Sequence, residues 1–226
     1  MAGFRRDSKR LSKPVWRTSD GPRPPASSIT VKPRLIVDAT CSSVSINPGD
    51  FRTQTQGGWG NEANGNNPGA YRDANFDSCF APNGATIGDV LGYAVTFTNA
   101  LAVEDFLPQG GTPGALTETA SNPTNRSAGV LGGQTLASVL NVGFDACDPD
   151  FGASSEALAD LVVDDPGADT VCKGMTVQDV LDAANRVLGG TELGSNPLPA
   201  EVNECADKIN NDFVDGTVVG GYLKLP

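Results

Sequence analysis

Two groups of acidic side chains are the residues of this chain whose spacing could support chemistry. Asp73, Asn75 and Asp77 have the D-x-N-x-D spacing that opens a calcium-binding loop, in which alternate oxygen ligands surround one hard cation. The rest of the EF-hand pattern is missing, because Ser78 stands at its sixth position and Gly84 at its twelfth. The spacing is therefore consistent either with a calcium ion or with an Asx-turn network that stabilises the loop.

The second acidic group consists of Asp145, Asp148 and Asp150 in the segment FDACDPDFG. Like-charged carboxylates this close attract either a cation or a basic segment of a neighbouring molecule. A pair of carboxylates could also hydrolyse a glycoside, but nothing in the sequence marks one acid as desolvated. The chain contains no His, which removes Ser-His-Asp, Cys-His and His-based acid–base chemistry. We therefore expect a protein that is not an enzyme.

Cysteine and tryptophan offer two further candidate sites. The five cysteines contain no C-x-x-C spacing, so with no His a zinc site is not expected. We predict two disulfides, one of them Cys147–Cys172, and one free thiol; the alternative is five reduced thiols. Trp59 lies among Gly57, Gly58 and Gly60, where it is either a hydrophobic lid on a small core or a platform that stacks on a sugar.

The first 34 residues differ in charge from the rest of the chain. Residues 1–34 hold nine of the sixteen Lys and Arg residues but only two of the 27 acidic ones, a formal charge of +7. The other residues hold seven basic and 25 acidic side chains, a formal charge of −18. Phosphate would be repelled by this acidic part, which makes nucleic acid an unexpected partner. No apolar run of 18 residues and no apolar signal region is present, so neither a membrane span nor a signal peptide is predicted.

The elements that must position these residues indicate the α+β class. We expect a loop-rich single body over 35–226, with a small β-sheet and about four short helices, and an extended basic N-terminal arm over 1–34. Apolar periodicity, caps and Gly/Pro breakers give the ranges. The predicted strands are 35–47, 53–56, 86–98, 158–163 and 218–225; the predicted helices are 100–107, 136–144, 176–188 and one that begins at Pro199.

Several segments resemble a poorly characterised group of bacterial secreted or cell-surface proteins. They are TQTQGGWG (53–60), YRDANFD (71–77), FLPQGGTPGALT (106–117) and GMTVQDVLDAANRVLGG (174–190). The resemblance covers about residues 50–216 and leaves the basic arm outside. It implies an extracellular or cell-surface setting and carries over no catalytic residue.

Together these observations favour a non-enzymatic structural subunit of an extracellular filament, sheath or surface layer. The arm would lie along the next subunit or add a strand to it, giving a homo-oligomer or polymer. The expected subunit contacts are five charged residues, Arg5, Arg6, Lys9, Arg10 and Lys13, and three apolar anchors, Phe4, Val15 and Trp16. The alternative is a cell-surface adhesion module that binds carbohydrate through Trp59, stabilised by calcium at Asp73, Asn75 and Asp77. A third hypothesis is a cytoplasmic protein whose arm binds nucleic acid.

Overall fold

The computed structural model describes residues 45–124, 128–165, 170–191 and 197–226, which belong to the acidic body. The arm over 1–34 lies outside the described residues, as do Cys41 and most of the strand predicted over 35–47. Also outside are the eight predicted contact residues of the arm: Phe4, Arg5, Arg6, Lys9, Arg10, Lys13, Val15 and Trp16.

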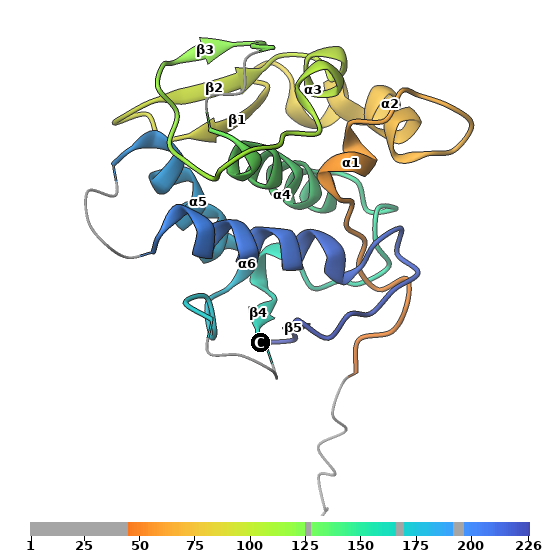
Figure 1. Cartoon of the computed structure of the whole chain (residues 1–226). Coiled ribbons are helices and arrows are strands. Elements are labelled where there is room, and N and C mark those ends of the chain that lie inside the picture. The colour runs from red at the N-terminus through yellow and green to blue at the C-terminus, as the bar shows by residue number, and fades with distance from the viewer. Residues whose placement is uncertain (1–44, 125–127, 166–169, 192–196) are drawn as a thin grey trace, which may run out of the picture. The chain divides into compact units, whose positions relative to one another are not determined.

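Helices and two small sheets confirm the predicted α+β class (Figure 1). The described residues form more helices than the four expected: α1 (Gln56–Trp59), α2 (Pro68–Phe80), α3 (Ala100–Phe106), α4 (Val130–Cys147), α5 (Val177–Gly189) and α6 (Pro199–Asp212), with a 3₁₀-helix, η1, at Leu158–Asp160. The strands are β1 (Ala85–Gly88), β2 (Ala94–Phe97), β3 (Ala120–Ser121), β4 (Val162–Val163) and β5 (Leu223–Lys224).

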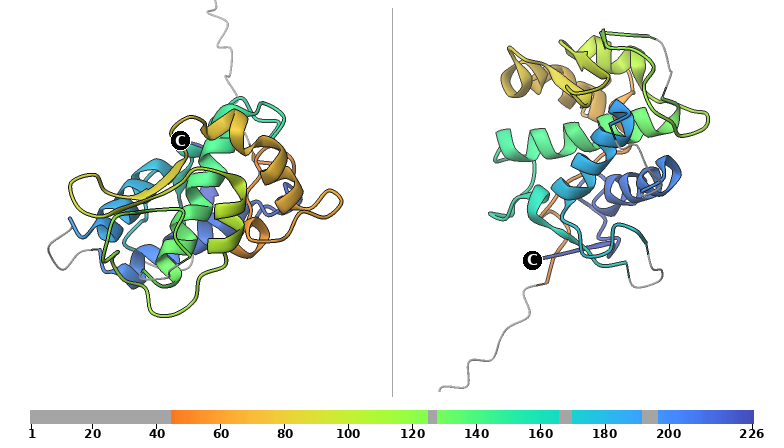
Figure 2. Two further views of the ribbon diagram at one scale, coloured as in Figure 1. Left: turned by 90° about the horizontal axis from the view of Figure 1, so that it is seen from above. Right: turned by 90° about the vertical axis from the view of Figure 1, so that its left-hand side faces the viewer.

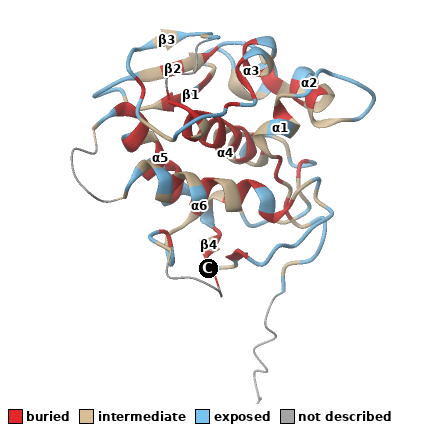
Figure 3. Ribbon diagram, in the orientation of Figure 1, coloured by how far each residue is buried: buried red, intermediate tan, exposed pale blue. Residues whose placement is uncertain are grey.

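Helix α4 lies at the centre of the body. Most of its residues are buried, and it packs against α1, α2, α5, α6 and β1 (Figure 3). Its apolar face includes Leu136, Leu140 and Phe144, as the spacing predicts. Gly133 lets the Gln56 side chain of α1 approach α4 closely, because a Cβ at position 133 would lie 2.0 Å from Oε1 of Gln56. A helix buried on nearly every side must be covered by other elements, and these form the layers of the fold.

The covering elements lie on opposite sides of α4 (Figures 1 and 2). The sheet β1–β2–β3 lies on one side, together with α2 and α3. Helices α5 and α6 lie on the other side, and the two-stranded sheet β4–β5 lies beyond them. The packing of α6 against both α4 and α5 joins the second layer to the centre.

The continuous strand predicted over 86–98 is wrong, because the chain reverses inside it. Strands β1 and β2 pair antiparallel, with Ala85 opposite Phe97, and β3 joins β2 in parallel. The reversal is stabilised by the Asp89 carboxylate, which accepts the backbone N–H of Leu91 at 2.9 Å. Gly88 has a φ of +90°, a conformation that favours glycine and ends β1. The alternation persists after the turn, so that Val95 and Phe97 face the core.

The two C-terminal helices follow their sequence signals closely. Thr176 caps α5 with a complete capping box, since its hydroxyl accepts the N–H of Asp179 and the Asp179 carboxylate accepts the N–H of Thr176. Gly190 ends α5 in the left-handed conformation, as the Gly-Gly pair predicts. Helix α6 begins at Pro199, the position that suits a residue without a backbone N–H.

The other predicted strands are shorter than expected. The run over 158–163 forms η1 and then the two-residue strand β4, and the run over 218–225 pairs only at Leu223–Lys224. The strand predicted over 53–56 is limited to one bridge, between Thr53 and Val214, because Thr55 caps α1. Short strands with few partners place most of the stabilisation on the helices.

The described residues contain two disulfides, the number predicted, but the predicted pairing Cys147–Cys172 is wrong. Cys79 pairs with Cys147, and Cys172 pairs with Cys205. The first bond joins the end of α2 to the end of α4, and the second joins the segment before α5 to α6. Packing between these helices brings the cysteines together, whereas the short sequence interval between Cys147 and Cys172 does not.

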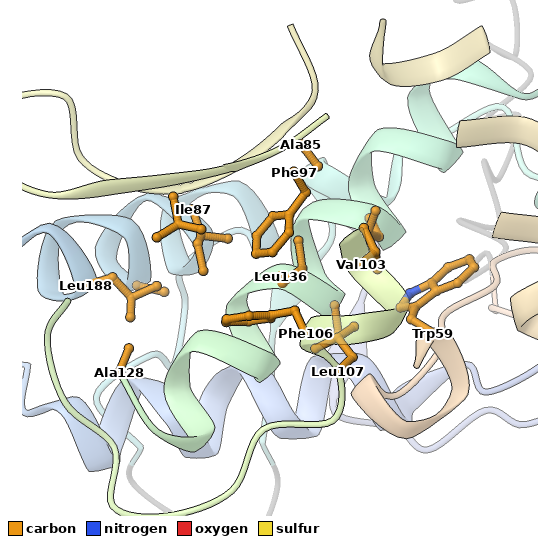
Figure 4. Close-up of a cluster of buried hydrophobic side chains, with 14 of the residues drawn as sticks. Trp59, Ala85, Ile87, Phe97, Val103, Phe106, Leu107, Ala128, Leu136 and Leu188 are labelled. Carbon is orange, nitrogen blue, oxygen red and sulfur yellow. The ribbon is translucent and has the colours of Figure 1, made fainter. Parts of the chain in front are cut away.

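Trp59 and Phe106 belong to the larger of two clusters of buried apolar side chains (Figure 4). This cluster lies between the sheet β1–β3 and α4, where Phe97 and Phe106 have ring centroids 4.8 Å apart. The second cluster joins α5 and α6 to the β4–β5 sheet and contains the buried Cys172–Cys205 disulfide. Most of the described body therefore shares two adjoining apolar interiors that meet at α4 and α5.

Candidate functional site at an acidic pocket

Trp59 does not form the sugar-stacking platform considered from the sequence. Its side chain is fully buried (Figure 4). Its ring centroid lies 5.1 Å from that of Phe144. The indole Nε1–H donates to Oδ1 of Asn141 at 3.0 Å, so the polar edge of the ring is satisfied inside the protein. A ring without an exposed face cannot stack on a ligand, and the alternative interpretation as a hydrophobic core residue is the correct one.

The calcium loop predicted at Asp73, Asn75 and Asp77 is also wrong, because these residues lie on α2. Residues two apart on a helix point to nearly opposite sides, so the three oxygen-bearing side chains cannot surround one ion. Asp73 instead forms an ion pair with Arg72 at 2.7 Å, and the Asn75 amide donates to the carbonyl of Tyr71. In the parts of the chain described, no group of three His, Cys, Asp or Glu residues is placed to hold a metal.

The helix that replaces this loop had a sequence signal. Asn67 precedes Pro68, and its side chain accepts the N–H of Ala70 at 2.8 Å as a helix N-cap. An N-cap residue followed by Pro in the first turn is a start signal for a helix. No helix is predicted here from the sequence, because the D-x-N-x-D spacing is interpreted as part of a loop.

The three carboxylates of the second acidic group, Asp145, Asp148 and Asp150, differ in their hydrogen bonding. Asp145 accepts the N–H of Leu158 at 2.7 Å, and burial raises the pKa of its carboxyl group. Asp148 accepts the hydroxyl of Tyr71 and the N–H of Asp150. The pKa of Tyr71 is raised, mainly by burial and to a smaller extent by the hydrogen bond to Asp148. Among the described residues, only the carboxylate of Asp150 in this group has no recorded hydrogen bond or ion pair.

The free carboxylate of Asp150 lines a cavity of about 340 Å³, which we call the acidic pocket. Its walls come from three segments that are far apart in the sequence: 49–52, 149–153 and 215–216. Backbone hydrogen bonds join them, from Ala153 N to the Gly49 carbonyl at 2.9 Å and from Asp215 N to the Thr53 carbonyl at 3.1 Å. The Cys79–Cys147 disulfide lies just before the 149–153 wall and fixes its start.

The pocket combines acidic, cationic and aromatic groups. Asp150 and Asp215 supply carboxylates, and Oδ1 of Asp215 already accepts the side-chain amide of Gln54 at 2.8 Å. Phe151 also lines the pocket, but its ring is buried in the apolar core. Arg52 also lines it, with Cζ 5.0 Å from the ring centroid of Tyr71 and 5.2 Å from that of Phe151. Within the described ranges, Arg52 has no ion pair, and its buried Nε has no hydrogen-bond partner. A planar cation held over rings in this way can stack on a further aromatic group.

A second cavity, of about 370 Å³, has less free bonding capacity. It lies between α6 and the chain before β5, where Lys208 contacts the Asp165 carboxylate at 2.8 Å. Both carboxylate oxygens of Asp212 accept backbone N–H groups, from Tyr222 and Leu223. Burial raises the pKa of Asp212 although these two bonds oppose the shift. Lys208 and these two carboxylates are thus already bonded within the protein, whereas Asp150 and Arg52 in the acidic pocket have no ion pair with any described residue, so the acidic pocket is the better candidate site.

The field around the acidic pocket is negative. The described residues include 22 Asp and Glu side chains against six Lys and Arg. Three of these six, Arg72, Lys208 and Lys224, are held in ion pairs with carboxylates. Asp50 and Asp148 flank the pocket walls and add to the negative charge there. An acidic field around an Arg52 guanidinium without an ion pair in the described part of the chain favours a ligand that carries both a cation and a planar ring.

Sequence reasoning found Asp150 but missed the other functional candidates, Arg52 and Asp215. They come from separate turns, and no local pattern connects them. Comparison with family models, with curated proteins and with solved structures finds no match for this chain. The resemblance of several segments to bacterial secreted or cell-surface proteins stays a prediction.

Proposed function

We propose that the protein is a non-enzymatic structural subunit of an extracellular filament, sheath or surface layer. In this proposal the basic arm of one copy binds the acidic body of the next. The observation that carries the proposal is the division of charge, +7 over residues 1–34 against 22 acidic and six basic side chains in the described body. Surfaces of opposite sign attract each other and determine which faces meet.

The described body supports this proposal because it holds two clusters of buried apolar side chains and two disulfides. A body that is packed and cross-linked in this way is a firm surface on which the arm of another copy can bind.

One observation is consistent with the extracellular part of the proposal. Disulfides such as Cys79–Cys147 and Cys172–Cys205 persist in oxidising environments outside the cytoplasm. Separately, within the described ranges, no helix has both the length and the apolar character needed to cross a membrane.

The residues that suggested the alternative, a carbohydrate-binding adhesion module, are not placed to bind a ligand. Trp59 is buried, and Asp73, Asn75 and Asp77 are spread around a helix. The hypothesis that the arm binds nucleic acid gains no support from the body, whose acidic field repels phosphate. Assembly through charge complementarity is thus the function that the described geometry supports best.

Deletion of residues 1–34 tests the proposal. The full chain should form dimers or larger assemblies that dissociate as NaCl is raised from 50 to 500 mM, because exposed ion pairs are screened by salt. The truncated chain should be a monomer with an unchanged circular dichroism spectrum. Light scattering after size-exclusion chromatography and electron microscopy measure both.

A matched control separates charge from length. It keeps the full arm but replaces five basic residues by Gln: Arg5, Arg6, Lys9, Arg10 and Lys13. This variant should assemble less than the full chain at 50 mM NaCl and should lose most of the salt dependence. A truncated chain that assembles like the full chain would refute the proposal, and so would a full chain that stays monomeric at every salt concentration.

A further inference from the structure

We propose that the acidic pocket is the receptor for one particular part of the arm, the segment Lys13-Pro14-Val15-Trp16-Arg17 of a second copy. This inference rests on the proposed function, since it names the contact through which the arm binds. Trp16 is the residue that enters the pocket, where it lies against the guanidinium group of Arg52. The charges of Lys13 and Arg17 lie beside Asp150 and Asp215 at the pocket wall.

The lining of the pocket matches the chemistry of this segment. The cavity is open to solvent on one side, and its volume of about 340 Å³ leaves room for a ring-sized group. The Arg52 guanidinium already contacts two aromatic rings and has no ion pair among the residues described, so it can stack on an indole. Asp150 is exposed and offers a carboxylate without a recorded partner, which a Lys or Arg side chain can contact.

The sequence of the segment suits an extended ligand. Pro14 fixes its own φ and disfavours helix at Lys13, so the segment favours the polyproline II conformation. That conformation repeats every three residues, which places Lys13 and Trp16 on the same side of the chain. One face can therefore present a cation and an indole together to a pocket that contains a carboxylate and the planar guanidinium of Arg52.

The arm of the same chain is the competing occupant. Arg17 is followed by 31 residues before Gly49 in the pocket wall, enough chain for an arm to reach its own pocket. Binding within one chain would leave the protein monomeric, whereas binding between copies links them. We commit to binding between copies, and the experiment below distinguishes the two.

The test uses two full-length variants, one changed in the arm and the other changed in the pocket. One variant carries Trp16→Ala in the arm; the other carries Asp150→Lys and Asp215→Asn in the pocket, at two exposed positions. Asn is chosen at 215 because the φ there is +57°, which Asn tolerates. Trp16→Ala should weaken self-association at least about 30-fold, as expected for a buried aromatic anchor. The pocket variant should weaken it about three- to tenfold, because exposed ion pairs contribute less.

Mixing the two variants shows whether the contact is between copies. The pocket variant has an intact arm, and the arm variant has an intact pocket, so one arm–pocket contact can form between them. The mixture should therefore contain a 1:1 heterodimer, and neither variant alone should dimerise at the same concentration. Native mass spectrometry detects it. A mixture that stays monomeric while the wild-type chain assembles would overturn the assignment.

Tryptophan fluorescence reports the indole directly. The chain has two Trp residues, and Trp59 is fully buried, so its emission should not depend on assembly. A shift of the emission to shorter wavelength as wild-type protein is concentrated would report burial of Trp16, and Trp16→Phe should abolish the shift. Assembly without such a shift would overturn the inference.

A charge control separates the pocket from the acidic body as a whole. Asp182→Lys changes an exposed carboxylate on α5, an element that contributes no residue to the pocket. It should assemble like the wild type. If Asp182→Lys and the pocket variant weaken assembly equally, the pocket assignment fails while the proposed function stands. If the wild-type chain does not assemble at all, the proposed function itself fails.

Discussion

Removal of the Cys79–Cys147 disulfide should lower the free energy of unfolding by about 4 kcal/mol. The bond joins residues 68 positions apart, and a cross-link that closes a loop of this length removes unfolded-chain entropy equivalent to about 4.4 kcal/mol at 25 °C. Cys147 is exposed and Cys79 is half-buried, so Ser hydroxyls at both positions stay near water and add little to the loss. The loss is large compared with the roughly 5–15 kcal/mol that stabilises an ordinary domain.

Urea denaturation of the double variant Cys79→Ser/Cys147→Ser against the wild type measures this loss. The midpoint should fall, and the dependence of the unfolding free energy on urea should become steeper, because the unfolded chain without the cross-link exposes more surface. Mass spectrometry of proteolytic fragments under non-reducing conditions should recover Cys79 joined to Cys147. A loss below about 1 kcal/mol, or a fragment in which Cys147 is joined to Cys172, would refute the reasoning.

Two further predictions concern the packing and the electrostatics of the body. Gly133→Ala should destabilise the fold by about 1–3 kcal/mol, because the new methyl group would lie 2.9 Å from Cβ of Gln109 and 2.0 Å from Oε1 of Gln56, an oxygen that accepts the N–H of Gln109 and cannot move without losing that bond. Gly57→Ala, whose nearest neighbouring atom is 3.8 Å away, should be neutral or slightly stabilising in thermal unfolding. Asp145→Asn tests a carboxyl group whose pKa is raised in the folded state by burial. The contribution of Asp145 to stability is fully present below its unfolded pKa and is lost as pH rises through the folded pKa. The stability of Asp145→Asn relative to the wild type, measured by urea titration, should therefore increase from pH 3 to pH 7. A relative decrease over this range would contradict the raised pKa.

Local signals in the sequence were sufficient for several elements. Thr176 and Asp179 fix the start of α5, Gly190 fixes its end, and Pro199 fixes the start of α6. Asn99 likewise caps α3 by accepting the N–H of Ala102. In each case the decisive hydrogen bond or backbone conformation lies within a few residues, so the pattern contains all the necessary information.

Other predictions failed because a local pattern had more than one physical meaning. The alternation of 86–98 is typical of a strand, but it does not show that a turn at Asp89 divides the strand in two. The spacing of Asp73, Asn75 and Asp77 brings their oxygens together in a loop and separates them on a helix. Trp59 among glycines is compatible with a surface and with a core, and only the positions of α2 and α4 around it decide for the core.

The sequence by itself determined the division of the protein into a basic arm and an acidic body, because charge is a property of composition. It also determined the α+β class and the number of disulfides expected. Only the tertiary structure decided which cysteines pair and which acids stay free, because both depend on distances between segments far apart in the chain. The acidic pocket is the clearest case: Arg52, Asp150 and Asp215 share no local pattern and meet only where three turns are joined by backbone hydrogen bonds.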